Sequence, residues 1–379
     1  MQDIAIIGGG FSGAMVLAHL VRHAPALRIA LIDDSPHCPR GAAYSTTHPE
    51  HLLNVPAARM GAFAEDAEGF HRWLLAEGHS YGPSDFVPRM LYGDYLASLH
   101  ADTLARGEHI SLFHARALSI TTGDVHRITL SDGSVCEAKQ VVLATGNPFP
   151  GDAAYITQPW RFDYAAIAGK SFAAPIVIIG TGLTAVDTFL SLRAHGVKAD
   201  IVFRSRHGHF PQPHSIDSKT ISLSPSMFEG LPLSAMLYRL RHIAREVMAA
   251  GHSWQAAIDA LRPHTQALWQ QLPLPEKRRF LKRLRHYWDI HRHRMAPSIH
   301  ATLQVALARG EARVMRGAVA SGEAIDAALV FDCTGPRHFV QAYPLLAPLL
   351  EAGILSASPT GLGLQAEDGY RVSRAGAAP

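Results

Sequence analysis

A short apolar run that breaks on glycines and then resumes with helical spacing occurs twice in this chain. The first copy, MQDIAIIGGGFSGAMVLAHL, stands at the N-terminus, and the second, APIVIIGTGLTAVDTFLSLRAHG, stands near the middle. Each run has the length of a buried parallel strand, and the spacing after it is typical of a helix. Two such strand–turn–helix units restrict the chain to an α/β fold with parallel strands.

In the first copy, Gly8, Gly10 and Gly13 form the pattern GxGxxG between an expected strand at 3–7 and an expected helix at 11–24. The first glycine permits a tight turn, and the second lets a pyrophosphate approach the backbone. The third lets the helix pack closely on the strand. These three roles predict a dinucleotide site, whereas the alternative is a tight turn that binds no ligand.

The residues around this pattern agree with a dinucleotide site. Phe11 and Ser12 open the helix, whose first N–H groups and partial positive charge favour phosphate. A second apolar strand at 28–32 follows, and Asp33 ends it, 20 positions after Gly13. An acid at this place is expected to hold a ribose hydroxyl.

In the second copy, Gly180, Gly182 and Ala185 form GxGxxA, and Leu183 and Thr184 open the helix. The pattern predicts a second dinucleotide site at this strand–helix junction.

The ribose position of the second copy carries arginines instead of an acid. The strand ADIVFRSR ends with Arg204, Ser205 and Arg206. An acid there would repel a 2′-phosphate, whereas arginine pairs with one in bidentate fashion. We therefore expect Arg204 and Arg206 to favour NADPH over NADH, the alternative being that both are solvated surface residues.

Two dinucleotide sites in one chain of 379 residues indicate two cofactors that meet, FAD and NADPH. The commonest arrangement is an FAD domain into which a pyridine nucleotide domain is inserted. We expect an α/β protein with two Rossmann-like dinucleotide-binding domains plus a helical segment. The expected bounds are 1–165 for the first part of the FAD-binding domain, 166–309 for the NAD(P)-binding domain with its helical insertion, and 310–379 for the return to the FAD-binding domain.

Two further apolar strands end in Thr-Gly. The first, VVLATG, closes on Thr145 and Gly146, and the second is VFDCTG. Both are expected at points where the chain crosses between domains, and Thr145 and Gly146 are expected to lie beside the flavin nucleotide.

Composition excludes several other classes of protein. A net charge of +3 is too small to indicate nucleic acid or a membrane surface as a partner. No apolar run is long enough to span a membrane, and the N-terminus lacks the features of a signal peptide. Cys38, Cys136 and Cys333 are far apart, which predicts a cytoplasmic protein and argues against a dithiol reductase.

The chain resembles bacterial FAD/NAD(P)-binding proteins that are relatives of the class B flavoprotein monooxygenases and N-hydroxylating monooxygenases. The resemblance rests on segments from residue 4 to about 337: IIGGGFSGAMVLAHL, GAAYSTTHPEHLLNVPAARMGAF, VVLATGNPFP, IIGTGLTAVD, HRHRMAP and VFDCTGPR. It implies a fold of two dinucleotide domains that uses FAD and NAD(P)H, and it supplies no substrate.

The chain departs from this resemblance in two places. The monooxygenase fingerprint FxGxxxHxxxW is absent, and QPWRFDY, which contains Trp160, stands in its neighbourhood. The flavin domain of such proteins usually closes with a glycine turn and a helix, whereas this chain is expected to be truncated at GLGLQAEDGYRVSRAGAAP.

The resemblance places the loop from Gly41 to Gly61 near the flavin ring. His51 and Asn54 in this loop, together with Trp160, are the candidate catalytic residues. An amide such as Asn54 could donate a hydrogen bond to the flavin edge or to a peroxide oxygen, and the equally open alternative is a loop amide that caps backbone groups.

The segment HYWDIHRHRMAP gathers His286, His291, Arg292, His293 and Arg294. It is either an anion-binding wall for an acidic substrate or a solvated basic helix end, which the helix dipole favours. Its histidines do not have metal-ligand spacing, so no metal site is predicted.

We therefore expect an FAD-dependent, NADPH-using oxidoreductase, a monooxygenase that acts on a small molecule, at nitrogen or sulfur. One alternative is an NADPH-dependent flavin reductase or dehydrogenase without oxygenation. Another is a nucleotide-binding regulatory protein without catalytic activity. The oligomeric state is left open.

Overall fold

The computed structural model describes residues 1–147, 157–160, 162–215, 219–320, 323, 325–335 and 340–372. The expected loop at 147–165 and the C-terminal end of the chain lie partly outside these residues. The chain divides into two compact units, the first made of Met1–Pro150 and Pro336–Pro379 and the second of Gly151–Gly335.

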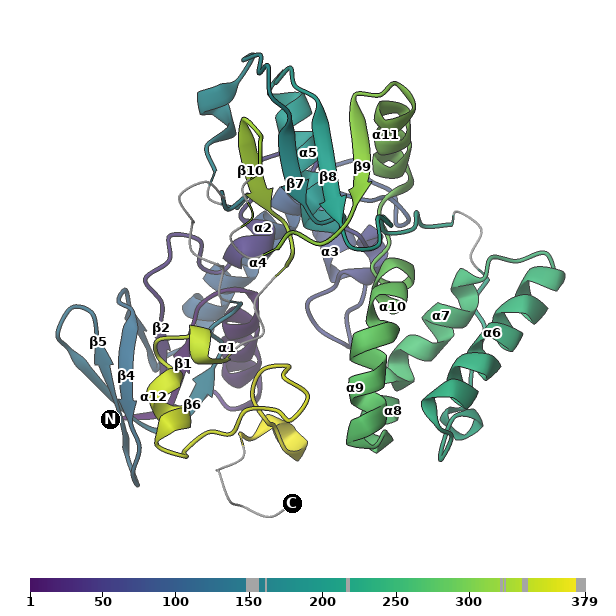
Figure 1. Ribbon diagram of the computed structural model, residues 1–379. Helices are drawn as coiled ribbons and strands as arrows, with labels where there is room; N and C mark the ends of the chain where they lie inside the picture. Colours follow the sequence, from purple (N-terminus) through teal and green to yellow (C-terminus); the bar gives the residue numbers. More distant parts are fainter. Residues whose placement is uncertain are drawn as a thin grey trace. The chain divides into compact units, whose positions relative to one another are not determined.

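The first unit is built on a six-stranded sheet of order β3-β2-β1-β6-β5-β4 (Figure 1). Strands β3, β2, β1 and β6 run parallel, and β4, β5 and β6 form an antiparallel meander. The elements of this unit are β1 (Gln2–Ile7), α1 (Phe11–His23), β2 (Ile29–Ile32), α2 (Gly41–Tyr44), η1 (Ala57–Arg59), α3 (Gly69–Ala76), α4 (Arg89–Arg106), β3 (Ile110–Phe113), β4 (Ala117–Thr121), β5 (His126–Leu130), β6 (Val135–Leu143), η5 (Val340–Ala342), α12 (Ala347–Glu351) and η6 (Asp368–Tyr370).

The parallel strands of the first unit are apolar on both faces because both faces are covered. On one face Ile6 and Leu31 pack against Leu17 of α1 and Leu104 of α4. The opposite face of β1 and β2 packs with apolar side chains of the meander, including Ile128. This two-sided burial explains why the strands read as unbroken apolar runs.

The segment after the second unit returns to the first sheet. Leu346 and Leu349 of the α12 region pack against Leu143 at the end of β6. The hydroxyl of Tyr343 donates a hydrogen bond to the carbonyl of Gly146 over 2.8 Å. The C-terminal segment is therefore attached to the same sheet end from which the chain leaves the first unit.

The second unit has a four-stranded parallel sheet of order β10-β7-β8-β9 and a helical segment between β8 and β9 (Figure 1). Its elements are η2 (Tyr164–Ile167), β7 (Ile176–Ile179), α5 (Leu183–Ala194), β8 (Ile201–Ser205), η3 (Pro225–Met227), α6 (Leu233–Ala249), α7 (Gln255–Leu261), η4 (Arg262–His264), α8 (Thr265–Gln271), α9 (Leu274–Arg283), α10 (Arg285–Arg292), α11 (Pro297–Ala308), β9 (Ala312–Arg316) and β10 (Leu329–Asp332).

The two sheets share one topology around their glycine units. In each, the first strand lies between the second strand on one side and a late strand on the other, namely β6 beside β1 and β10 beside β7. Ligands of such sheets bind outside the carboxyl ends of the strands, where the strand order reverses. The shared topology confirms the predicted α/β fold and places both glycine turns at such a point.

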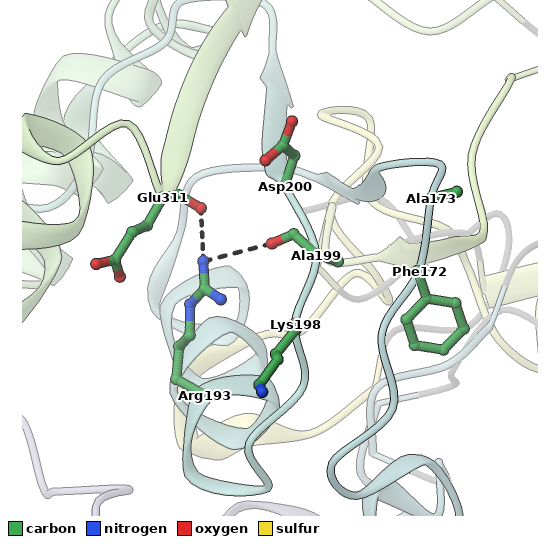
Figure 2. A pocket seen from close by; sticks show the side chains of 7 residues that line it. All are labelled: Phe172, Ala173, Arg193, Lys198, Ala199, Asp200 and Glu311. Carbon is green, nitrogen blue, oxygen red and sulfur yellow. Dashed lines mark hydrogen bonds between the residues drawn. The ribbon is translucent and has the colours of Figure 1, made fainter.

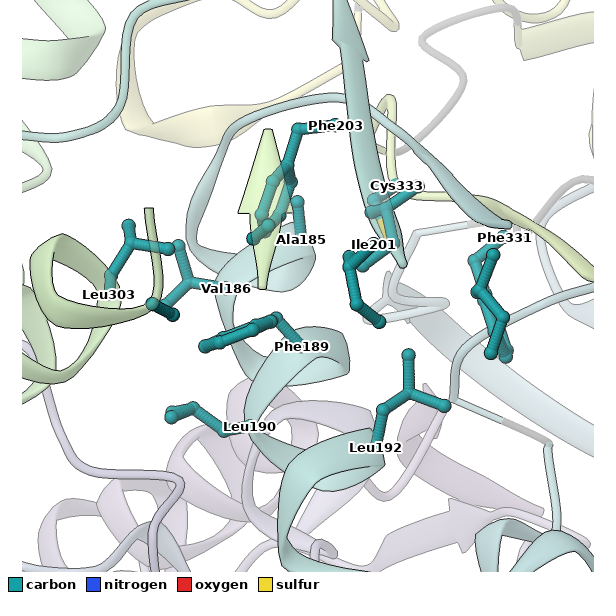
Figure 3. Close-up of a cluster of buried hydrophobic side chains, with 14 of the residues drawn as sticks. Ala185, Val186, Phe189, Leu190, Leu192, Ile201, Phe203, Leu303, Phe331 and Cys333 are labelled. Carbon is teal, nitrogen blue, oxygen red and sulfur yellow. The ribbon is translucent and has the colours of Figure 1, made fainter. Parts of the chain in front are cut away.

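One face of the second sheet carries its main core (Figure 3). Ala185, Val186 and Phe189 of α5 pack against Phe203 of β8, and Leu303 of α11 joins the same cluster. Phe189, Phe203 and Leu303 are almost completely buried. The third position of GxGxxA is thus a core alanine, which explains why a methyl group is accepted there.

The helical segment has its own apolar core and is clamped by a buried ion pair. Arg294, 1% exposed, pairs with Asp259 of α7 and donates to Gln255 Oε1 over 2.6 Å. Gln255 in turn binds the backbone of Pro213 and Ser215. Arg294, one of the basic residues near Pro297, is therefore neither solvated nor open to an anion.

The strands also correct the expected domain bounds. Residues 310–335 were assigned to the return into the first domain, but β9 pairs with β8 and β10 pairs with β7. The compact units change at 150/151 and 335/336, just after the two Thr-Gly strand ends, rather than at 165/166 and 309/310. Parallel strands separated by long insertions leave no local signal of which sheet they join, so pairing alone decides.

We expect Arg294→Met to lower the free energy of unfolding by about 3 kcal/mol, because Gln255 loses this donor and Asp259 keeps the more distant Arg262, at 3.9 Å. Urea denaturation of the full chain measures this. The matched control is Arg285→Met, since Arg285 forms an exposed ion pair with Asp289 and such pairs contribute about 1 kcal/mol or less. Equal losses in the two variants would contradict the clamp.

Candidate functional site

The first glycine turn is fixed by a contact with the end of β6. Gly8 has φ +101°, and a Cβ built on it would lie 2.2 Å from the carbonyl oxygen of Ala144. The Ala144 N–H bonds the Ile7 carbonyl over 2.8 Å, and the Gly8 N–H bonds the Ile32 carbonyl over 2.9 Å. The turn is therefore held from both neighbouring strands, immediately before Thr145 and Gly146.

The other two glycines of the first unit play different parts. A Cβ on Gly13 would lie 1.8 Å from the Gly8 carbonyl oxygen, so only glycine lets α1 pack on the turn. A Cβ on Gly10 would meet only the backbone of Gly41, at 3.4 Å, which is ordinary contact. Gly10 caps α1, and Phe11 and Ser12 follow it. A Cβ at position 10 would clash with nothing in the protein itself. Glycine there serves as the helix cap and also leaves room for a bound group.

Asp33 lies beside this turn. One of its carboxylate oxygens accepts a hydrogen bond from the Gly9 N–H, and the other accepts the Ser35 N–H over 2.6 Å. Cys38 is the neighbouring thiol, and burial together with Asp33 raises its pKa to about 11. The thiol therefore stays protonated at neutral pH and is unsuited to act as a nucleophile.

The second glycine turn repeats the first. Gly180 has φ +119°, and its Cβ would lie 2.5 Å from the carbonyl oxygen of Cys333, the residue before Thr334-Gly335. Gly182 caps α5, and a Cβ on it would meet nothing within 4 Å. Leu183 and Thr184 form the first turn of α5. Gly182 therefore faces open space, as a residue that must admit a ligand should.

The hydrogen bonds also set the correspondence between the two turns. The Gly180 N–H bonds the carbonyl of Arg204, just as the Gly8 N–H bonds that of Ile32. Ser205 therefore corresponds to Asp33. It also contacts the turn in the same way, since the Thr181 hydroxyl donates to the Ser205 hydroxyl over 3.1 Å.

The two arginines of the second unit differ in their surroundings. Arg204 forms an ion pair with Glu323 at 2.5 Å and donates to the Ala318 carbonyl over 3.2 Å. The Ala320 N–H and Arg204 lower the pKa of Glu323, so the acid is ionised at neutral pH. Arg206 lies beyond the end of β8 and is exposed. Arg204 already has an anionic partner from this chain, and Arg206 is the more accessible cation.

A histidine cluster lies next to Arg206. The sequence predicts its member His286 as part of a possible anion-binding wall, but it does not predict the contacts of His286 with His207 and His209. The rings of His207 and His286 stack at 4.0 Å between centroids, and His209 Nδ1 lies 2.9 Å from His286 Nε2. His286 belongs to α10, far along the chain from His207 and His209. Spacing in the sequence could not have indicated this cluster, because folding alone brings α10 to the end of β8.

Two of the candidate catalytic residues lie in the first unit. His51 is 8% exposed, its Nδ1 lies 2.7 Å from the hydroxyl of Thr46, and its ring stacks on His48. Asn54 is partly exposed. The surroundings of His51 suit a structural residue, which leaves Asn54 as the more suitable group for contact with a ligand.

The loop that carries Asn54 is firmly attached. The Leu53 N–H bonds the Val87 carbonyl over 2.8 Å, and the Ala57 N–H bonds the Asp85 carbonyl over 3.0 Å. Leu53 and Ala57 are buried in one apolar cluster. The expected long loop between Gly41 and Gly61 is thus a packed segment that holds Asn54 on a defined backbone.

Trp160, the third catalytic candidate, is partly buried in the second unit and is described with that unit alone. His51 and Asn54 lie in one loop of the first unit, and Trp160 belongs to the second unit. Arg161 lies outside the described residues.

A cavity of about 430 Å³ lies at the opposite edge of the second sheet (Figure 2). Arg193, at the end of α5, donates to the carbonyls of Glu311, Ala199 and Val197 over 2.6, 3.5 and 3.3 Å. These carbonyls flank the amino ends of β8 and β9, whereas nucleotides bind at the carboxyl ends. The cavity is therefore separate from the glycine turn.

The described residues contain neither a membrane-spanning helix nor a cluster of metal ligands. No helix in this part of the chain is long and apolar enough to cross a membrane. Within the same residues, no group of three or more histidine, cysteine, aspartate or glutamate side chains is arranged to hold a metal ion.

Comparisons with known proteins agree with the fold. Residues 5–148 match the model of a family described as FAD-NAD(P)-binding. No curated protein sequence matches the chain at a significant level.

Solved structures cover nearly the whole chain. Ornithine hydroxylase from Pseudomonas aeruginosa has 15% identity and a TM-score of 0.57, with 99% of this chain and 89% of that chain covered. An ornithine N-hydroxylase from Kutzneria sp. 744, with reduced FAD, NADP+ and L-ornithine, has 12% identity, a TM-score of 0.58 and the same coverage. A cyclohexanone monooxygenase variant from Rhodococcus sp. Phi1, bound to NADP+, has 15% identity and a TM-score of 0.50, over 88% and 72%. The family model and the shared fold confirm the resemblance seen in the sequence.

The two glycines of the second turn should respond differently to alanine. Gly180→Ala should lower the free energy of unfolding by about 3 kcal/mol, because of its positive φ and its contact with Cys333. Gly182→Ala should cost about 1 kcal/mol or less, the penalty of a weaker helix cap. Urea denaturation of both variants measures the difference, and a larger loss from Gly182→Ala would contradict the geometry.

Proposed function

We propose that this protein is an FAD-dependent, NADPH-using oxidoreductase of the monooxygenase type that acts on a small molecule in the cytoplasm. The observation that carries the proposal is the repeated glycine turn at the carboxyl edge of two parallel sheets, in a fold shared with ornithine hydroxylases over 99% of the chain. The N-hydroxylation of ornithine by the Kutzneria protein supports an amine as the substrate class, and a thioether is the alternative from the sequence.

The residues of the first turn fit the FAD pyrophosphate and ribose. Gly10 leaves room for the pyrophosphate beside the turn, and α1 offers its first N–H groups to it. Asp33 can give up the Gly9 N–H or share it when a ribose hydroxyl arrives. Thr145 and Gly146 follow β6 at the same edge of the sheet.

The second turn fits the pyrophosphate of NADPH. Gly182 faces open space, and α5 supplies the amide N–H groups of its first turn, at Leu183 and Thr184. Ala185 packs in the core, so it sets the position of the helix rather than touching the ligand.

A bound flavin would supply the redox chemistry, since it can accept a hydride from NADPH and can react with O2. This chain's own residues then bind and orient the two nucleotides, donate hydrogen bonds and exclude water. Asn54 is held on a packed backbone, so its amide can donate to an oxygen atom without first becoming ordered. Tyr44 and Phe11, with ring centroids 5.9 Å apart, supply apolar cover near Gly10.

Replacing Gly10 by valine should abolish flavin retention without unfolding the chain. The larger side chain occupies the space that the pyrophosphate needs. The measurement is the ratio of visible to ultraviolet absorbance of the purified variant, with a thermal melt as the folding check. Gly182→Val is the matched control, because it should keep its flavin and lose NADPH binding. Full flavin content in the Gly10→Val protein would refute the assignment of this turn.

Asn54→Ala should leave the rate of flavin reduction by NADPH nearly unchanged and raise the share of NADPH equivalents released as hydrogen peroxide. The physical reason is the loss of a positioned donor, which typically costs a factor of about 100 in a stabilised step. Stopped-flow reduction and a peroxide assay measure the two quantities. Slower reduction with unchanged peroxide would assign Asn54 to nucleotide binding instead.

Substrate coupling separates the proposal from its alternatives. A panel of amines and thioethers should include one that lowers peroxide release and yields an oxygenated product in proportion to the NADPH consumed. Complete release as peroxide with every compound, alongside reduction of an artificial acceptor, would favour a flavin reductase. A purified protein without flavin absorbance, even after addition of FAD, would favour a regulatory role.

A further inference from the structure

A cluster of histidines lies at the end of β8, where the second unit is expected to contact the 2′-position of the nucleotide. The sequence pattern does not explain this cluster. By the hydrogen bonds of the two turns, Ser205 corresponds to Asp33, the ribose-reading position. Arg204 then corresponds to Ile32, a residue within the sheet, and successive residues of a strand point to opposite faces. Arg204 is also paired with Glu323. The 2′-phosphate therefore needs a different set of cations.

We propose that the 2′-phosphate of NADPH is bound by Arg206 together with the cluster His207, His209 and His286, and that this cluster takes up a proton when it binds. This inference rests on the proposed function and adds to it the residues that select NADPH and a dependence of that selection on pH.

Geometry supports this assignment. Arg206, His207 and His209 follow β8 directly, where a nucleotide ribose is expected. The three imidazoles are in contact: His207 and His209 stack on His286 with centroids 4.0 and 5.0 Å away. His209 Nδ1 lies 2.9 Å from His286 Nε2, so one of these two nitrogens must donate a hydrogen bond and the other must accept it. At most one of those two nitrogens therefore carries the shared proton.

The groups that act most strongly on His286 are basic. The groups that act on His286 are His207 and His209, Arg206 and, from the same helix, His291. On the neighbouring strand, Arg316 lies 3.0 Å from where a Cβ of Gly208 would be. The acid of α10, Asp289, pairs with Arg285. Tyr287, whose ring centroid is 4.7 Å from that of His286, adds a neutral wall.

The basic neighbours of His286, together with the pairing of Asp289 with Arg285, explain how the cluster couples to protons. Burial and the surrounding cations lower the pKa of His286 to about 4, so its ring is neutral at neutral pH in the free protein. A bound phosphate supplies the missing negative charge and favours the protonated ring. The pKa of His286 then rises on binding, its ring takes up a proton, and affinity for the 2′-phosphate increases as the pH falls.

Calorimetric titration of the full-length protein with 2′,5′-ADP and with 5′-AMP tests this directly. The 2′-phosphate should tighten binding roughly ten-fold at about pH 8 and more at about pH 6.5, with proton uptake seen as a dependence of the heat on the buffer's ionisation. Because the phosphate also titrates near pH 6, the pH effect is read as the difference between the unmodified protein and His286→Gln.

Four variants test which residues provide the gain in affinity from the 2′-phosphate and its dependence on pH. Arg206→Ala should remove the gain from the 2′-phosphate, and His286→Gln should flatten its pH dependence. His242→Gln is the matched control, because His242 is an exposed residue of α6, and it should change neither quantity. If Arg204→Ala instead removes the gain, or His286→Gln keeps the full pH dependence, the inference is overturned.

The same titrations distinguish a failure of this inference from a failure of the proposed function. Binding of 5′-AMP with no gain from the 2′-phosphate overturns this inference and leaves an NADH-using oxidoreductase. Failure of both nucleotides to bind a correctly folded protein overturns the proposed function together with the inference.

Discussion

The fold depends on a backbone contact that only glycine permits. In each unit the first glycine of the turn, Gly8 or Gly180, lies against the carbonyl oxygen of the residue that follows a parallel neighbour strand, Ala144 or Cys333. A side chain at either glycine would push the two strand ends apart. The close contact aims the following helix across the strand ends, so that its N–H groups face the edge where both sheets reverse their strand order. The repeated unit of the sequence thus fixes both where a nucleotide binds and where the chain leaves each sheet.

The availability of a cation is decided by its partner, not by its place in the sequence. Arg204 and Arg294 both look like anion-binding residues in the sequence, yet Glu323 and Asp259 neutralise them. A buried arginine requires such a partner, because an unpaired charge in the interior is costly. The histidine cluster beside Arg206 behaves in the opposite way. In our proposal, the ring of His286 stays neutral until an anion binds, which avoids this cost.

Much of the fold was predictable because it depends on local patterns. The strand, glycine and helix order around Gly8 and Gly180 is written in adjacent residues, and steric limits on φ leave few other folds for it. The pairing of β9 and β10 with the second sheet was not predictable, since it depends on contacts across a long insertion. For the same reason, the pairing of Arg204 with Glu323 and the approach of His286 to His209 left no trace in spacing. Asn54 was found as a candidate from the resemblance, while the packing that holds its loop became clear only from the hydrogen bonds to 85–87.

Arg193 has a consequence for how such a protein can change during evolution. By holding the carbonyls of Ala199 and Glu311, its guanidinium ties the entry of β8 to the entry of β9, which brackets the whole helical excursion between these strands. The segment between these strands is not uniform. Its helix α11 contributes Leu303 to the main core of the sheet, whereas the apolar side chains of α6 to α9 pack in a separate cluster. The stretch that can change in length and surface while the sheet keeps its core is therefore the one that precedes α10.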